Sequence, residues 1–531
     1  MKRKERLGAG SGDRRVCRER LRLAESARDL LAARYEEGDD VLSAARAHWL
    51  DGRPKSAVEA AWAAFDRAPA DRKSKRELVN LLHGFPSELT TDREPALLAL
   101  LTDPEVDPDS LNHAGWQRVL QRHGCGGVGP DAPSEDTLAE LTAALEADAL
   151  ALALLRESPV VSVPAQRMLM HVRRRLLLSG DSDRFPFLVE ALRAQALLNG
   201  GAWPYDDEER PRLSTGDTVL AAAYVARPSE QSGADTTFTD SVTRAVAAQY
   251  EGWPYPSWRR ITRGAAKRLP DTVRALDPGG SPDLPVDAQI LVAGCGTGRH
   301  SAYVAASYPD ATVTAIDISE ASLEYARART AALGIENVRF RRLDLYDVAT
   351  LRETYDAIYC AGVLHHLPDP ELGLAALTDA LRLGGVMRLM VYSRLARLTV
   401  AAARTLVRDL LDRPVSDDLL REIRRRFLER SEHPLAGHVL GFKDFATLAG
   451  VYDLLMHRHE DPFDVPRIER ALRAYGLRLL RFELPTPADS ARYDRSFPDD
   501  KLHRDYKSWR EFELGAPTMF RAMYDFWCRR D

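Results

Sequence analysis

Apolar positions recur along the chain with two different periods. In residues 23–225 they follow the helical period within Ala-, Leu- and Arg-rich segments, whereas in residues 286–485 short apolar runs alternate with helical patterns. Breaks in the first region fall near Gly52, Pro86, Gly126 and Gly180. The patterns predict an all-α region followed by an α/β domain with a doubly wound, mainly parallel sheet.

Shifts in composition divide the chain further. Pro, Ser, Gly and Asp gather in residues 226–237, which indicates a linker. The predicted segments are a basic, flexible N-terminus (1–22), the helical domain (23–225), a linker with an aromatic stretch (226–285), the α/β domain (286–485) with a helical insertion (393–462), and a C-terminal extension (486–531).

The C-terminal extension lacks a clear strand pattern. A sixth strand is predicted at residues 477–484, but no seventh is evident after it. Phe520, Met523, Tyr524 and Trp527 are spaced for one helical face. We therefore expect a terminal helix that covers the edge of the sheet in place of a last strand.

Residues 41–70 resemble a single tetratricopeptide repeat. A helix through Trp49 is followed by a turn at Gly52, and Ala57, Ala64 and Pro69 stand at the spacing of the repeat. No convincing second copy follows. An Ala-rich helical hairpin would give the same spacing through ordinary helix packing, so both interpretations stay open.

A glycine-rich turn begins the α/β domain. The apolar run 289–293 leads directly into Gly294-Cys295-Gly296-Thr297-Gly298, and a helical pattern follows at 299–307. Glycines let a ligand approach the backbone closely, and the free N–H groups of a helix start favour an anionic or polar group. Because a lone Gly-x-Gly motif is weak evidence, the neighbouring elements must support a nucleotide site.

Four further strand patterns follow at the spacing of a parallel sheet. They are 312–316, which ends at Asp317; 337–343, which ends at Asp344-Leu345; 355–360, which opens onto Gly362 to Leu367; and 385–392, which follows Leu383-Gly384. Ligands of such sheets bind at the carboxyl ends of the strands, where both acids stand.

From Ile290 to Tyr392 this series resembles the class I S-adenosylmethionine-dependent methyltransferases, which have a Rossmann-like sheet. A dinucleotide oxidoreductase shares the first glycines, but it usually has a third glycine where this chain has Arg299. A looser resemblance links Tyr250-Glu251 and Pro254 to Trp258, together with residues 517–527, to a bacterial subgroup with helical repeats before the methyltransferase domain.

The resemblance implies that S-adenosylmethionine is the cofactor and methyl donor. Within the family pattern, the glycines hold the methionyl side, Asp317 the ribose, and Asp344 with Leu345 the adenine. The implied cofactor-binding residues are Ala293, Gly294, Cys295, Gly296, Gly298, Asp317, Ile318, Asp344, Leu345, Ala361 and Gly362.

His365 and His366 follow the fourth strand, where the family brings residues toward the transferred methyl group. An imidazole titrates near neutrality, so either is a candidate catalytic base. Either could instead cap the next helix or bond to a neighbouring loop. Methyl transfer by in-line displacement needs no metal, and we assign His457 and His459 a structural role because no acid or Cys cluster at a known ligand spacing accompanies them.

Two segments stand beside the expected cavity with open roles. The aromatic stretch 249–258 is either a lid over the cofactor or a hinge that docks domains. The insertion 393–462 either covers the acceptor or is a packing surface. Its arginines could meet an acidic acceptor, although a solvated face is favoured; they are Arg394, Arg397, Arg404 and Arg408.

Charge and composition narrow the partners. A net charge of −5 gives no overall attraction to nucleic acid, and no apolar run approaches the roughly 20 residues that span a bilayer. Five scattered cysteines fit a reduced, cytoplasmic protein. We expect a methyltransferase whose acceptor, through O, N or C, is a small molecule or a protein captured by the helical half. The alternative is a scaffold that senses the cofactor without catalysis.

Overall fold

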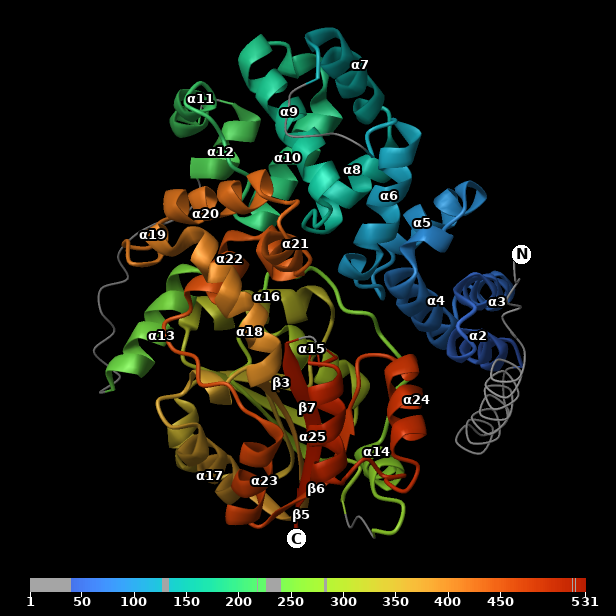
Figure 1. Cartoon of the computed structure of the whole chain (residues 1–531), viewed down its shortest axis with the longest axis vertical. Helices are drawn as coiled ribbons and strands as arrows, with labels where there is room; N and C mark the ends of the chain where they lie inside the picture. Colours follow the sequence, from blue (N-terminus) through green and yellow to red (C-terminus); the bar gives the residue numbers. More distant parts are fainter. Residues whose placement is uncertain are drawn as a thin grey trace, which may run out of the picture.

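The computed structural model describes residues 40–126, 133–216, 218–225, 240–280, 284–517, 519–520 and 522–531. The predicted basic N-terminus (1–22) and the whole of the predicted linker at 226–237 lie outside these residues. Helices make up one end of the molecule and the sheet with its helices makes up the other (Figure 1). No helix of the described ranges has the length and apolar character to cross a membrane.

The first region is all-α, as predicted. Its helices are α2 (Asp40–Leu50), α3 (Pro54–Arg67), α4 (Arg72–Gly84), α5 (Glu94–Thr102), α6 (Asn112–Arg122), α7 (Glu135–Glu146), α8 (Ala149–Glu157), α9 (Val163–Ser179), α10 (Pro186–Asn199), α11 (Glu209–Thr215) and α12 (Val219–Val225), with the short helix η3 (Pro108–Leu111). They share one apolar core. Helices α2 and α3 form a hairpin that turns at Gly52, but a tetratricopeptide repeat stays a prediction.

The second region contains a seven-stranded sheet in the order β3-β2-β1-β4-β5-β7-β6. Its strands are β1 (Gln289–Ala293), β2 (Thr312–Asp317), β3 (Val338–Arg342), β4 (Tyr355–Ala361), β5 (Leu381–Tyr392), β6 (Leu477–Glu483) and β7 (Met523–Arg530). Strands β1 to β5 pair in parallel, and β7 runs antiparallel to both β5 and β6. The predicted α/β class is confirmed. The strand order runs outward in opposite directions from β1 and β4, which are neighbours in the sheet.

The expected terminal helix is wrong, because residues 523–530 form strand β7. Tyr524, Phe526 and Cys528 alternate into the core on one face of the sheet, and Trp527 enters the core on the other face. The helical spacing of the aromatic residues suggested a helix, but pairing of β7 with two neighbouring strands satisfies its backbone on both edges. The seventh strand is therefore present.

Helices cover both faces of the sheet. One face packs on α17 (Pro370–Ala380), α23 (Val465–Ala474) and α25 (Tyr506–Gly515), and the other on α14 (Leu269–Leu276), α15 (Arg299–Ser307) and α16 (Glu320–Ala332). Helix α24 (Pro487–Ser496) lies near α25 (Figure 1). Helix α13 (Ser241–Gly252) contacts α16.

The predicted insertion is helical, as expected. Its helices are α18 (Arg394–Ala403), α19 (Arg408–Leu411), α20 (Asp417–Glu429), α21 (Pro434–Leu440) and α22 (Leu448–Met456), with the short helix η8 (Lys443–Ala446). They form a core of their own and lie between the sheet and the first region (Figure 1). The buried Arg424 donates to Gln166 of the first region across this boundary at 2.6 Å. The insertion therefore connects the two halves.

Candidate active site

A cavity of about 690 Å³ lies at the carboxyl ends of β1, β2 and β4. This is the edge at which a parallel sheet with a reversal of strand order binds its ligands. Of the predicted site residues, the cavity wall includes Gly294, Cys295, Gly296, Asp317, Ile318, Asp344, Leu345, Ala361, Gly362 and His366. Ala293, Gly298 and His365 are not in the wall. The sequence thus located one end of the cavity.

The glycine loop after β1 has a backbone that requires glycine. Gly294 has a φ of +66°, and a side chain there would come within 2.3 Å of Val363. A Cβ on Gly296 would stand 2.9 Å from the carbonyl oxygen of Tyr255. Gly298 is the N-cap residue just before α15, has its own positive φ and lies close to Ala326 of α16. The loop therefore exposes backbone, rather than side chains, to the cavity.

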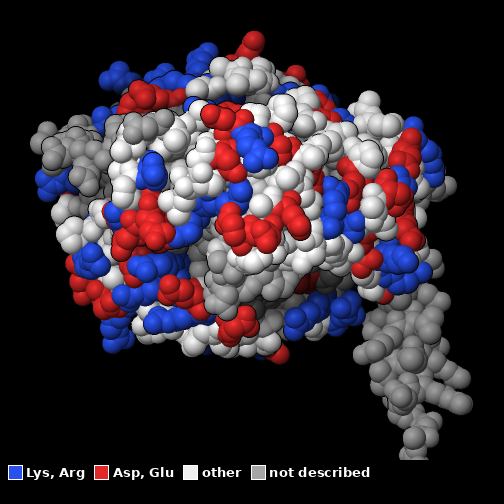
Figure 2. All heavy atoms as spheres, turned by 90° about the horizontal axis from the view of Figure 1, so that it is seen from above, with Lys and Arg blue, Asp and Glu red and all other residues white. Residues whose placement is uncertain are grey.

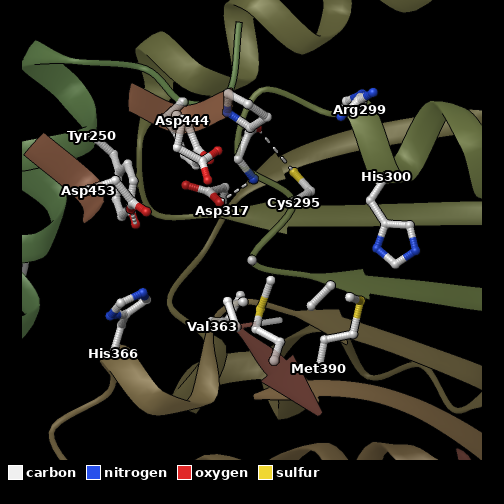
Figure 3. A pocket seen from close by; sticks show the side chains of 18 of the residues that line it. Tyr250, Cys295, Arg299, His300, Asp317, Val363, His366, Met390, Asp444 and Asp453 are labelled. Atoms are coloured by element: carbon white, nitrogen blue, oxygen red, sulfur yellow. Dashed lines mark hydrogen bonds between the residues drawn. The ribbon is translucent and has the colours of Figure 1, made fainter. Parts of the chain in front are cut away.

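Asp317 at the end of β2 holds this loop in place. One carboxylate oxygen accepts from the N–H of Gly296 at 2.7 Å (Figure 3). The other accepts from the N–H of Ser319 at 3.0 Å. The side chain is 9% exposed, and burial raises its pKa. Asp344 ends the neighbouring strand with its pKa raised by burial as well. Both acids thus face the cavity from adjacent strand ends.

The aromatic stretch is fastened directly to the glycine loop. Trp258 donates from its indole N–H to the carbonyl of Thr297 at 2.8 Å, and the Thr297 hydroxyl donates to the carbonyl of Pro256 at 2.5 Å. Glu251 accepts from the Ser319 hydroxyl and from the N–H of Ala321 at the start of α16. This stretch is therefore a fixed wall of the cavity, and Tyr250 and Tyr255 line it.

The far end of the cavity holds a network of buried polar groups. The Tyr250 hydroxyl donates to Asp453 of α22 at 2.7 Å, and it lies 3.2 Å from Nε2 of His457. Nδ1 of His457 accepts from the N–H of His459 at 3.1 Å, so the ring proton is on Nε2 and points to Tyr250. The chain of donors therefore ends on the Asp453 carboxylate, whose pKa burial raises to about 7.

The two predicted histidines of η6 (Leu364–His366) have different environments. Nδ1 of His366 lies 2.8 Å from the carbonyl of His459, which can only accept, so this nitrogen is protonated and Nε2 carries a lone pair. Burial lowers the pKa of His366 to about 3. His365 is 0% exposed, and its Nδ1 accepts from the N–H of Tyr392 at 3.0 Å. Of the two, His366 is the one that faces the cavity.

Among the four arginines singled out in the insertion, Arg397 lines the cavity. Its guanidinium pairs with Glu460, donates to the carbonyl of Leu454, and lies 4.4 Å from the centre of the Tyr392 ring. Arg394 and Arg408 are exposed, as the solvated-face interpretation expected. That interpretation is wrong for Arg397, which is buried, and for Arg404, which is half-buried and pairs with Glu460. On the face of the molecule in Figure 2, acidic and basic side chains are interspersed rather than gathered into a basic patch.

The all-α region contributes to the same cavity. Its wall includes four residues from α4 and η3 or next to η3, which are Arg76, Asn80, Asp107 and Ser110. Asp107 pairs with Arg299, the first residue of α15, on the side of the loop opposite Asp453 (Figure 3). The N–H of Arg263 donates to the carbonyl of Glu105 at 2.9 Å. Both halves of the chain are therefore needed to close the cavity.

His366, Asp453 and His457 place potential metal ligands within 4.8 Å of one another. Two observations count against an ion there. The rings of His366 and His457 are stacked 3.6 Å apart at 20°, so they do not point to a common centre. His457 also carries its proton on the nitrogen that would face the ion, whereas a ligating nitrogen must be unprotonated.

Sequence reasoning missed Asp453, Tyr392 and Arg76, and it gave Tyr250 no chemical role. Asp453 stands in the helical pattern of α22 with no local motif around it. Long-range contacts bring it to Tyr250, which is remote in the sequence. The segment His457 to His459 could have indicated this end of the cavity. The sequence assigns it a structural role, and the carbonyl of His459 orients the ring of His366 that faces the cavity.

Comparison with known proteins agrees with this geometry. The family model described as a methyltransferase domain matches residues 290–385. An uncharacterised protein of Synechococcus sp. is 32% identical over 303 residues, which are 52% of this chain and 68% of that protein. The trans-aconitate 2-methyltransferase of Deinococcus radiodurans is 38% identical over 104 residues, 20% of this chain and 38% of its own.

The match to solved structures is weaker. PKMT2 from Rickettsia typhi in complex with AdoHcy has a TM-score of 0.38 and 17% identity over 52% of this chain and 55% of that chain. This likeness is too slight to inform the site. The chain spans less than half the length of the trans-aconitate 2-methyltransferase that it matches.

Proposed function

Because this chain belongs to the class I S-adenosylmethionine-dependent methyltransferases, we propose that it methylates an acceptor held in the cavity between the sheet, the insertion and the helical region. One observation carries the proposal. At one end of the cavity stand a glycine loop and an acid at a strand end, which suit the donor. The other end carries buried polar groups that the donor site does not use.

The residues present fit the donor. Gly296 leaves room where any side chain would meet the backbone of Tyr255, and Gly362, with a φ of +76°, has open space where its Cβ would be. Asp317 presents a buried carboxylate that can accept from ribose hydroxyls. We assign Gly294, Cys295 and Gly296 to the methionyl side, Asp317 and Ile318 to the ribose, and Asp344 and Leu345 to the adenine.

The bound donor supplies a methyl group on a sulfonium, and the chain has to orient the acceptor and exclude water. The fixed aromatic wall and the insertion serve the exclusion of water, since Tyr250, Tyr255 and Tyr392 line the cavity. His366 and Asp453 supply hydrogen-bond acceptors at its polar end. The earlier candidate His365 is assigned a structural role, because its Nδ1 is used by the backbone of Tyr392.

We assign the helical half to the wall of the acceptor chamber rather than to recruitment of a protein. Arg76 and Asn80 of α4 support this assignment, since they line the cavity. In a labelled-donor assay, Arg76→Ala should lower methyl transfer while the donor affinity stays unchanged. Lys73→Ala, an exposed residue of the same helix that is not in the cavity wall, is the matched control. Equal activity of both variants would count against the assignment.

The acceptor cannot be transferred from the relatives. Proteins that match similar lengths of this chain carry different names, among them trans-aconitate 2-methyltransferase and ubiquinone biosynthesis O-methyltransferase. The shared segment covers the donor end of the cavity, whereas Asp453 and Arg397 belong to the insertion after it. The acceptor must therefore be inferred from the polar end itself.

Isothermal titration of the full chain with S-adenosylmethionine tests the donor. We expect binding by the wild type and a loss of at least about tenfold in affinity for Asp317→Asn, which removes one of two carboxylate acceptors. Asp310→Asn, an exposed acid just before β2, is the control. Absence of binding at millimolar donor would refute the proposed function, and turnover with labelled donor separates an enzyme from a cofactor-sensing scaffold.

A further inference from the structure

The polar end of the cavity has a ligand chemistry of its own. We propose that it is the acceptor subsite for an amine that enters as an ammonium group, with Asp453 as the general base and His366 as the acceptor that orients the nitrogen. The inference rests on the proposed function and names the class of acceptor for the same site. It predicts N-methylation.

His366 offers a lone pair that cannot easily be lost. Its Nδ1–H is fixed on the carbonyl of His459, so Nε2 is unprotonated, and the side chain is 94% buried, with 6% exposed. Burial holds the ring in its neutral form. A ligand at this position therefore has to donate a hydrogen bond rather than accept one.

Asp453 offers the second acceptor. One of its oxygens receives the Tyr250 hydroxyl, and no described residue donates to the other. The carboxylate is 6% exposed and lies in the cavity wall beside Tyr250, facing His366 across the opening (Figure 3). A carboxylate oxygen that opens onto the cavity from a largely buried residue, with no donor from the described residues, favours a ligand that brings a donor.

The spacing of the two acceptors favours nitrogen. A ring nitrogen of His366 and a carboxylate oxygen of Asp453 lie within 4.8 Å of each other, a span that one ligand nitrogen can bridge with two hydrogen bonds of roughly 2.9 Å. An ammonium group has three protons and an amine two, whereas a hydroxyl has a single proton and can serve one acceptor. A carboxylate has none to donate. The pair of acceptors therefore discriminates by proton count.

The surrounding charges favour a cation as well. The groups that face Asp453 are Tyr250 of α13, His366 of η6, Tyr392 at the end of β5, Arg397 of α18, Asp444 of η8, Glu460 of the following loop, and His457 after its own helix. Arg397 and Arg404 both pair with Glu460, so two cations face the three carboxylates Glu460, Asp444 and Asp453, and one negative charge is left in surplus when all three are ionised. Burial disfavours this surplus unless a cation joins it.

The reaction balances without a further reagent. The ammonium N–H bond breaks, the proton forms an O–H bond on Asp453, and the electron pair stays on nitrogen. That pair forms the new N–C bond as the C–S bond of the donor methyl group breaks and its electrons go to sulfur, which leaves as a neutral thioether. The methylated nitrogen carries the positive charge, and the proton on Asp453 passes to water when the products leave.

Binding of simple probes tests the subsite before any natural acceptor is known. The full chain, saturated with S-adenosylhomocysteine, is titrated with butylammonium, butanol and butyrate, and binding is followed by thermal shift and calorimetry. We expect butylammonium to bind at least about tenfold more tightly than the other two, a preference of roughly 1.4 kcal/mol. Equal affinity for butanol or butyrate would overturn the inference.

Variants and pH complete the test. Asp453→Asn should lose the ammonium preference and keep the affinity for S-adenosylhomocysteine, while Asp412→Asn, an exposed acid of the insertion, should change neither. In the wild type, butylammonium binding should weaken about tenfold for each pH unit below about 7, as Asp453 takes up a proton. A flat pH profile in the wild type would contradict the role of Asp453.

Failure of the two proposals can be told apart. If S-adenosylhomocysteine does not bind, the proposed function fails and the acceptor inference falls with it. If it binds and the probes show no ammonium preference, the inference alone fails. Labelled donor incubated with a cell extract then identifies the methylated atom and shows whether the amine belongs to a small molecule or a protein, and a label on oxygen or carbon would also overturn the inference.

Discussion

The two ends of the cavity are assembled in different ways. The donor end comes from neighbouring strand ends, since Asp317 is the last residue of β2, and Gly294 and Asp344 follow β1 and β3. The polar end comes from remote segments, because Tyr250 precedes the sheet, His366 follows β4 and Asp453 belongs to the insertion. Local backbone geometry thus forms the end that we assign to the donor, whereas tertiary packing forms the end that we assign to the acceptor.

This difference explains what each end can tolerate. The donor loop depends on positions where only backbone fits, so small side chains there do harm. The polar end depends on buried charge and on the direction of protons, and these are unfavourable for folding unless a ligand compensates them. The predictions below separate these two kinds of dependence.

The largest expected effect is a gain of stability at the polar end. The folded-state pKa of Asp453 is raised from 3.8 to about 7, so the folded protein binds this proton more tightly than the unfolded chain does. Stability is therefore full below the unfolded pKa and is lost as pH rises toward 7. Asp453→Asn should avoid a loss of up to about 4 kcal/mol at pH 8.

Melting temperatures of the wild type and of Asp453→Asn, measured from pH 4 to pH 8, check this. The melting temperature of the variant should rise relative to that of the wild type as pH rises, and the difference between the two should vanish near pH 4. Asp412→Asn controls for the loss of one negative charge on the insertion. A difference in melting temperature that does not depend on pH would mean that ionisation of Asp453 does not destabilise the folded protein.

At the donor end, Gly294→Ala should weaken binding of S-adenosylmethionine by about 100-fold, or about 3 kcal/mol. The new methyl group would stand 2.3 Å from Val363, and the residue would keep a φ of +66°. Gly334→Ala has a φ of +64° but nothing within 4 Å, so it should cost stability without changing donor affinity. Calorimetric titration of both variants separates obstruction from backbone strain.

Much of the donor end could be predicted from sequence, because each motif there lies within one strand-loop-helix unit. The strands β1 to β6 and the positions of Asp317 and Asp344 were found in this way. Strand β7 was missed because its aromatic spacing also fits a helix, and the decision rests on its pairing with β5 and β6. Asp453 was missed because its partner Tyr250 is distant in the chain.

Arg299→Ala tests how firmly the helical half is attached to the donor loop. Arg299 begins α15 and pairs with Asp107, next to Asp109, whose pKa is raised by burial and by Asp107. Without the arginine, two neighbouring carboxylates lose a cation, and we expect the free energy of unfolding to fall by about 2 kcal/mol. The fall is smaller than for a fully buried pair because Arg299 is partly exposed.

Denaturant unfolding of Arg299→Ala, with the exposed Arg339→Ala as control, measures this loss. Limited proteolysis should also cut the variant faster between the helical half and the sheet. If the two variants unfold alike, the ion pair does not fasten the halves, and the cavity wall supplied by α4 would depend on apolar packing instead.

The smallest effect is expected where the two ends meet. Glu251 stands between Tyr250 and the donor loop, and it accepts from the Ser319 hydroxyl at 3.0 Å and the N–H of Ala321 at 3.2 Å, at the start of α16. Its charge also raises the pKa of Asp317, although burial is the larger cause.

Glu251→Gln keeps an acceptor oxygen and removes the charge, so two opposed changes follow. The N-terminus of α16 loses an electrostatic stabilisation of about 0.5 kcal/mol, while Asp317 ionises more readily. The affinity for S-adenosylmethionine should therefore change by no more than about threefold. A larger loss would show that the aromatic stretch positions the donor loop through charge, and the contrast between a donor end set by backbone and an acceptor end set by packing would no longer hold at this residue.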